Sequence, residues 1–186
     1  MPPLLFIAFA LAASHRSDPA PSVRRSDGLA AWQKVYSVLV SPRCINCHTA
    51  TSYPQQGDDR HRHFANVVRG PRDRGVVALS CVTCHQSTNA DSTGVPGAHD
   101  WHLAPPSMRW QDANDHPLSS AEVCRSVLRQ LDGPRLLKHH EEEPLLLWAW
   151  NPGRRPDGTM RTSPPITHGE FVEATRLWVA AGTPCP

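Results

Sequence analysis

The chain has 186 residues, of which 39% are hydrophobic and only 6% aromatic, and its formal net charge is +2. This length suits one compact domain or two small lobes, with a thin core for its size. The sequence shows no stripe of lysine and arginine with interleaved aromatic residues, which argues against nucleic-acid binding. Its 19 prolines and 11 glycines predict long loops and short helices.

The N-terminal segment reads as a signal peptide over residues 1–13. No lysine or arginine precedes the apolar run Leu4–Ala12, which ends in the small-x-small pattern of Ala10–Ala12. The alternative is an uncleaved anchor, but the run is far shorter than the ~20 residues that a span requires. We therefore expect a periplasmic or otherwise exported protein with no transmembrane span in the mature chain. Residues 14–27, rich in serine, proline and arginine, are predicted to form a flexible linker.

A helical pattern begins near Gly28, with apolar residues at spacings of three and four up to Leu39, and it stops before Pro42. A short motif of two cysteines and a histidine follows at once, and it occurs twice in the chain. Cys44–His48 and Cys81–His85 each read Cys-x-x-Cys-His, the pattern that attaches a c-type haem. The cysteines Cys44, Cys47, Cys81 and Cys84 would form thioether bonds to two haems, and His48 and His85 would be the proximal iron ligands.

Two other chemistries use Cys-x-x-Cys pairs. Zinc ribbons usually separate their pairs by about 15–20 residues, whereas the gap from Cys47 to Cys81 is much longer. A thiol-exchange pair explains neither the second copy nor the histidine after each pair. Two covalently bound haem c groups are therefore the predicted cofactors, and a structural zinc protein is the main alternative.

The segments around the second motif supply candidates for the remaining iron ligands. Tyr53–Ser80 is rich in arginine and contains His63; it is either a solvated loop or a source of guanidinium partners for haem propionates. A loop from Gly94 to Trp110 contains His102 and Met108. We predict His63 as the distal ligand of one haem, and His102 or Met108 as that of the other. The choice matters because bis-histidine and histidine–methionine ligation give different reduction potentials.

The C-terminal part, residues 117–186, is expected to be a helical cap on a haem-binding part over 28–110. Capping boxes begin helices at Ser119 and Thr167, and a short helix is predicted over Pro134–Glu142. The apolar run Leu145–Trp150 is either a buried turn or a strand. Cys124 and Cys185 remain once the haem motifs take four cysteines, and in an exported protein they most simply form a disulfide, free buried thiols being the alternative.

The chain resembles a family of exported dihaem cytochromes labelled as related to isoquinoline 1-oxidoreductase, a molybdenum-containing hydroxylase. Six segments carry the resemblance: Asn66–Gly70, Cys81–Gln86, Trp101–Pro105, Trp148–Gly153, His168 with Phe171, and Gly182–Pro186. Together they cover most of the chain from Cys44 to its end. The resemblance implies roles for histidines or methionine at His63, His102, Met108, His139 and His168.

These observations predict a mostly α-helical, loop-rich dihaem cytochrome c domain over residues 28–186, with little or no sheet. The expected function is electron transfer, not catalysis, between redox protein partners: a molybdenum hydroxylase or other dehydrogenase as donor, and a terminal acceptor. A dihaem peroxidase is the enzymatic alternative; it would need one iron with an open or releasable distal position.

Overall fold

The computed structural model describes residues 23–186, of which 43% are helical and 9% are in strands or bridges. The prediction of a mostly helical chain with little sheet is confirmed at this level. The predicted signal peptide, residues 1–13, lies outside the described residues, as does most of the predicted linker. None of the helices in residues 23–186 is both long and apolar enough to cross a membrane.

The first helix, α1 (Arg25–Leu39), begins earlier than the Gly28 start expected from its apolar pattern. The linker predicted over 14–27 therefore extended too far at its C-terminal end. Asp27 lies in the first turn and accepts hydrogen bonds from the Arg24 guanidinium. An acidic side chain here suits the partial positive charge of a helix N-terminus, a polar signal that apolar periodicity does not register.

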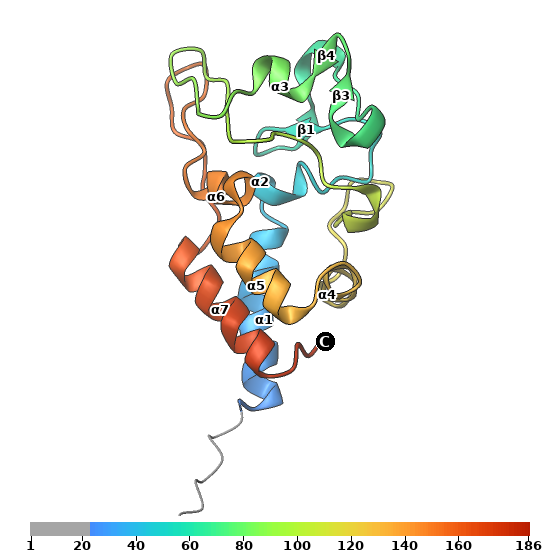
Figure 1. Cartoon of the computed structure of the whole chain (residues 1–186), viewed down its shortest axis with the longest axis vertical. Helices are drawn as coiled ribbons and strands as arrows, with labels where there is room; N and C mark the ends of the chain where they lie inside the picture. The colour runs from blue at the N-terminus through green and yellow to red at the C-terminus, as the bar shows by residue number, and fades with distance from the viewer. Residues whose placement is uncertain (1–22) are drawn as a thin grey trace, which may run out of the picture.

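A group of four helices forms the lower half of the molecule in Figure 1. α1 packs along α7 (His168–Ala180), with α5 (Gly133–Glu142) beside α7 and α4 (Ser120–Leu128) near α1. The core of this group includes Trp32 and Trp178, whose fully buried rings have centroids 4.5 Å apart. Gly28 permits α1 to approach the C-terminal end of α7 closely, because a Cβ at this position would lie 2.4 Å from the Cβ of Ala181.

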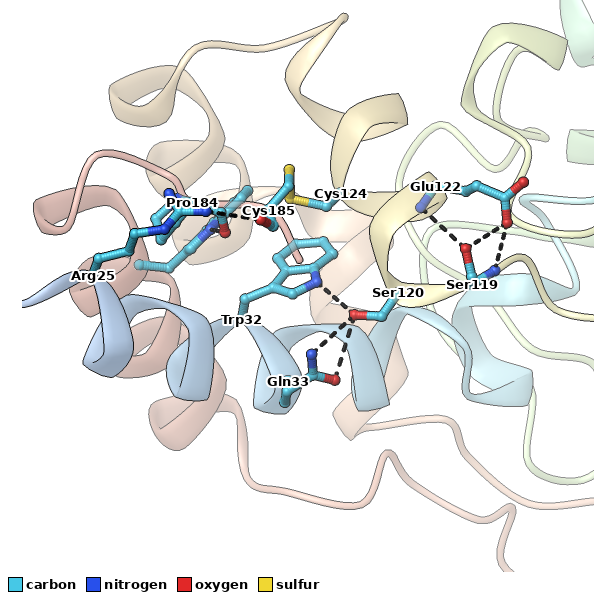
Figure 2. Close-up of a disulfide and its surroundings, with 10 residues drawn as sticks. Arg25, Trp32, Gln33, Ser119, Ser120, Glu122, Cys124, Pro184 and Cys185 are labelled. Atoms are coloured by element: carbon cyan, nitrogen blue, oxygen red, sulfur yellow. Dashed lines mark hydrogen bonds between the residues drawn. A yellow bond between two sulfur atoms is a disulfide. The ribbon is translucent and has the colours of Figure 1, made fainter.

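Both predicted capping boxes are present. Ser119 caps α4 and Thr167 caps α7, each with the glutamate three residues later reaching back to the cap residue. On α7 the side chains of Phe171, Ala174 and Trp178 are buried, whereas Leu177 is 40% exposed. Figure 2 shows the disulfide between Cys124 on α4 and Cys185 in the C-terminal tail, with the Trp32 indole donating to Ser120 nearby.

The upper half of the molecule in Figure 1 consists of loops held by very short elements. Two antiparallel hairpins pair β1 (Gln55–Gln56) with β2 (His61–Arg62), and β3 (Gly75–Val76) with β4 (Leu79–Ser80). Single turns of 3-10 helix are η1 (Phe64–Asn66), η2 (Pro71–Asp73) and η3 (Pro106–Met108). The short α-helices α2 (Pro42–Ile45) and α3 (Cys81–Cys84) complete this half.

Arg69 connects several of these loops through hydrogen bonds. Its guanidinium donates to the carbonyl oxygens of Thr49 at 3.0 Å and Ala104 at 2.6 Å, and pairs with Asp73 at 2.7 Å. Next to it, Gly70 has φ +63°, and a Cβ there would lie 2.0 Å from the carbonyl oxygen of Gly75. The run Leu145–Trp150, which periodicity left undecided, is helical: α6 (Pro144–Leu147) continues into η4 (Trp148–Trp150).

Candidate functional site

The two Cys-x-x-Cys-His motifs occupy equivalent local structures. α2 carries Cys44 and leads into Cys47 and His48, and α3 comprises Cys81–Cys84 with His85 as its C-cap. In both, the backbone N–H of the histidine donates to the carbonyl of the first cysteine, His48 to Cys44 at 3.1 Å and His85 to Cys81 at 2.9 Å. One helical turn thus brings both cysteines and the histidine of each motif together.

The four motif cysteines form no disulfide. Burial raises the pKa of Cys44 to about 12 and that of Cys47 to about 11, and it also raises the pKa of Cys81. Thiol exchange requires a thiolate, and its cysteines have lowered pKa values. The surroundings of these thiols therefore disfavour the thiol-exchange alternative.

Each motif histidine is oriented in the same way. The Nδ1–H of His48 donates to the carbonyl of Met108 at 2.7 Å, and that of His85 donates to the carbonyl of Pro96 at 2.8 Å. This bond fixes the tautomer and leaves Nε2 with a lone pair, as in most metal-ligating histidines. Burial is the main cause that lowers the pKa of His48 to about 3, and it also lowers the pKa of His85. Both rings are thus held neutral, the form that binds a metal.

A tryptophan lies flat against each of these imidazoles. Trp110 stacks on His48 with centroids 3.4 Å apart and planes 4° apart, and Trp101 stacks on His85 at 4.4 Å and 5°. Nothing in the spacing of the sequence indicated either partner. Together with the Nδ1 bonds, the stacking leaves each ring little freedom to rotate.

His48 opens onto a cavity of about 440 Å³, which we call the His48 cavity. Cys44 and Cys47 line it, and its apolar walls come from α1, α4, α5 and η4, including Leu39, Val127, Leu136 and Trp150. Typical small-molecule pockets have about 300–1,000 Å³. The volume of the His48 cavity therefore lies within the range of pockets that hold small molecules.

His85 opens onto a second, smaller cavity of about 180 Å³, the His85 cavity, which Cys81 and Cys84 line. The opposite wall includes His63, whose ring centroid lies 5.9 Å from that of His85 with the planes 72° apart. The Nδ1–H of His63 donates to the carbonyl of Phe64 at 2.7 Å, which again leaves Nε2 available. Among the predicted distal ligands, the structure thus brings His63 to the second motif.

The two cavities adjoin. The residues that line both of them are Arg43, Cys47, Trp101, His102 and Trp148. Trp101 and Trp148 meet edge to face at 4.8 Å. A group attached through Cys47 would therefore border the space that belongs to the second motif.

His102 and Met108 both line the His48 cavity, but their relation to His48 differs. The Nδ1–H of His102 donates to the carbonyl of Asp100, the pattern already seen at His48, His63 and His85. Met108 instead offers its backbone carbonyl to His48. The main chain of Met108 is therefore on the side of the His48 ring that faces away from Nε2.

The remaining histidines implied by the family resemblance have other surroundings. His168 donates from Nε2 to the carbonyl of His140 at 2.8 Å, next to Trp150. His139 lines the His48 cavity, as does its neighbour His140, which hydrogen-bonds Thr175 through Nδ1 at 2.9 Å. Of these two neighbours on α5, only His140 is buried, whereas His139 is exposed.

The arginines of Tyr53–Ser80, which were considered as partners for haem propionates, lie outside the linings of the two cavities. None of Arg60, Arg62, Arg69, Arg72 and Arg74 lines either cavity. Arg74, for example, pairs with Asp100 at 2.7 Å. The arginines that do line the cavities are Arg43 and Arg161. Neither was predicted from the sequence, because both lie outside the arginine-rich segment Tyr53–Ser80.

The walls also contain polar atoms that a bound group would satisfy. Among the described residues, Arg43 Nε, Asn46 Oδ1, Gln55 Oε1 and Trp110 Nε1 are buried without a hydrogen-bond partner, and all four residues line one or both cavities. Buried polar atoms normally have partners. Arg43 Nε and Trp110 Nε1 are donors that a carboxylate would satisfy, whereas Asn46 Oδ1 and Gln55 Oε1 are acceptors and need a donor. The thiols, the oriented imidazoles and these two donors fit two haems with their carboxylates.

Comparison with known proteins adds no family. No family model, no curated protein sequence and no solved structure matches the chain.

Within residues 23–186, no group of three or more histidine, cysteine, aspartate or glutamate side chains is arranged to hold a metal ion.

Proposed function

We propose that the protein is a dihaem c-type cytochrome that carries electrons between protein partners. The observation that carries this proposal is the repeated geometry at the two motifs. In each, a helical turn presents two free thiols and a neutral histidine, whose Nδ1–H is bound to a carbonyl, to an adjoining cavity.

The same carbonyl pattern supports a proposal for which residues would ligate each iron. His63 and His102 share with the motif histidines an Nδ1–H bound to a backbone carbonyl. We assign His85 and His63 to the second haem and His48 and His102 to the first. Metal–nitrogen bonds of about 2 Å place the centres of two opposed imidazoles roughly 6 Å apart, which matches the 5.9 Å between His63 and His85.

Met108 is the weaker choice for the first haem. Its carbonyl already accepts the His48 Nδ1–H, so its main chain lies behind the proximal ring. To reach the opposite side of the iron, its thioether would have to pass around the macrocycle. This reasoning favours bis-histidine ligation, and hence low reduction potentials, at both haems.

The haem irons supply the redox chemistry, and the chain determines where electrons enter. Cys84 is exposed and Cys81 is half-buried, so the second haem would approach the surface. The His48 cavity lies deeper, against the core helices. Because both cavities share the Cys47 and Trp148 wall, electrons from a partner at the second haem would have a short path to the first.

The proposed partners are redox proteins in the periplasm or another exported location, with a dehydrogenase or molybdenum hydroxylase as donor. Electron-transfer encounters of this kind are typically small and transient. The protein itself would catalyse no substrate conversion, because the proposed ligands would leave neither iron an open position for peroxide.

Ligand binding and potentiometry distinguish the carrier from the peroxidase alternative. We expect the matured protein to take up two electrons reversibly and to bind neither cyanide nor peroxide rapidly in the oxidised form. Rapid cyanide binding at one haem with conversion of peroxide would instead assign that haem to catalysis. Protein that contains zinc and no iron would support the structural zinc alternative.

A further inference from the structure

Arg43 occupies an unusual position between the two cavities. It lies on α2 immediately before Cys44, and its side chain is only 5% exposed. It lines both the His48 and the His85 cavity, with its guanidinium carbon 5.8 Å from the ring centre of Trp148. Its Nε is buried and has no hydrogen-bond partner.

The charges around Arg43 do not balance. Asp58 accepts from Arg43 and also from Arg155, and it receives a third bond from Thr162 at 2.8 Å. Arg161, which lines only the His85 cavity, donates to three carbonyls, those of Gly94, Pro152 and Arg154, rather than to a carboxylate. Two guanidiniums thus share one aspartate, and the third, that of Arg161, bonds no carboxylate. Buried cations need paired anions, and propionates are the carboxylates that haems would bring.

The geometry points to Arg43 as a counter-charge shared by both haem sites, which pairs with haem carboxylate and raises the reduction potentials of both haems together. This inference rests on the proposed function. A positive charge near an iron favours the reduced state, because reduction adds an electron, and burial reduces the solvent screening of that charge. Since Arg43 lines both cavities, its removal should affect both irons.

The test is a spectroelectrochemical titration of the matured wild type and four variants. For Arg43→Gln we expect both midpoint potentials to fall by at least a tenfold change in the equilibrium constant for reduction, which is 59 mV for a one-electron couple. Arg43→Lys retains the charge and should recover most of this loss. The matched control is Arg161→Gln, which should lower only one potential, because Arg161 lines one cavity.

Asp58→Asn tests the same field with the opposite sign. Removing this carboxylate while Arg43 remains should raise both potentials, and the result decides the matter if Arg43→Gln does not incorporate haem. Two haems with unchanged potentials in Arg43→Gln, or a shift at one haem only, would overturn the inference while leaving the carrier function intact. A wild-type protein without haem would instead refute the proposed function on which the inference rests.

Discussion

Replacing His63 with alanine should convert the second haem from six-coordinate low-spin to high-spin, while the first haem remains low-spin. His63 faces His85 across the His85 cavity at 5.9 Å between ring centroids, and its Nε2 has no hydrogen-bond partner within residues 23–186. Removing the imidazole opens one axial position. We therefore expect the oxidised variant to bind cyanide, and the reduced variant carbon monoxide, at one haem per molecule.

His61 provides a matched control for this variant. It lies two residues away, lines neither cavity, and directs Nδ1 to Asp59 at 2.6 Å. His61→Ala should leave both haems low-spin and insensitive to cyanide, as measured by visible absorption and electron paramagnetic resonance. A His63→Ala protein with two low-spin haems would show that another residue is the ligand.

Removing the Cys124–Cys185 disulfide should cost about 4 kcal/mol of unfolding free energy, since in the chain-entropy model a loop of this size restricts the unfolded chain by that amount. The bridged residues are 61 positions apart. The bond holds the C-terminal tail against α4. The tail is also held by the Trp178 indole of α7, which donates to the carbonyl of Pro184 at 2.9 Å. The measurement is chemical denaturation of the matured Cys124→Ala/Cys185→Ala protein.

The single variants serve as the control for this effect. Because either substitution breaks the same bond, Cys124→Ala and Cys185→Ala alone should each lose most of what the double variant loses. Their spectra and haem content should match the wild type, as the disulfide lies away from both cavities. A double variant that unfolds at the wild-type denaturant concentration would contradict this expectation.

The helices could be predicted from the sequence because their signals are local. Capping boxes at Ser119 and Thr167 and the apolar spacing of Trp32, Phe171 and Trp178 each follow from residues within one or two turns. The start of α1 was missed because Arg24 and Asp27 mark it by charge.

The site was only partly predictable, because much of it depends on contacts between segments that are far apart in the sequence. The Cys-x-x-Cys-His motifs are contiguous, and so were found at once. Arg43, Trp110 and Trp148 act on the cavities through contacts between segments far apart in the chain, which no spacing encodes. The preference for His102 over Met108 likewise depends on which carbonyl each histidine Nδ1–H reaches.

The central claim is most directly tested by the intact mass of the protein after expression with a c-type haem maturation system. The account predicts the mass of the processed chain plus two haems that resist acid–acetone extraction, and one haem fewer for the Cys81→Ala/Cys84→Ala variant. A mass that corresponds to the polypeptide alone would contradict it, and every ligand assignment made for the two cavities would then fail.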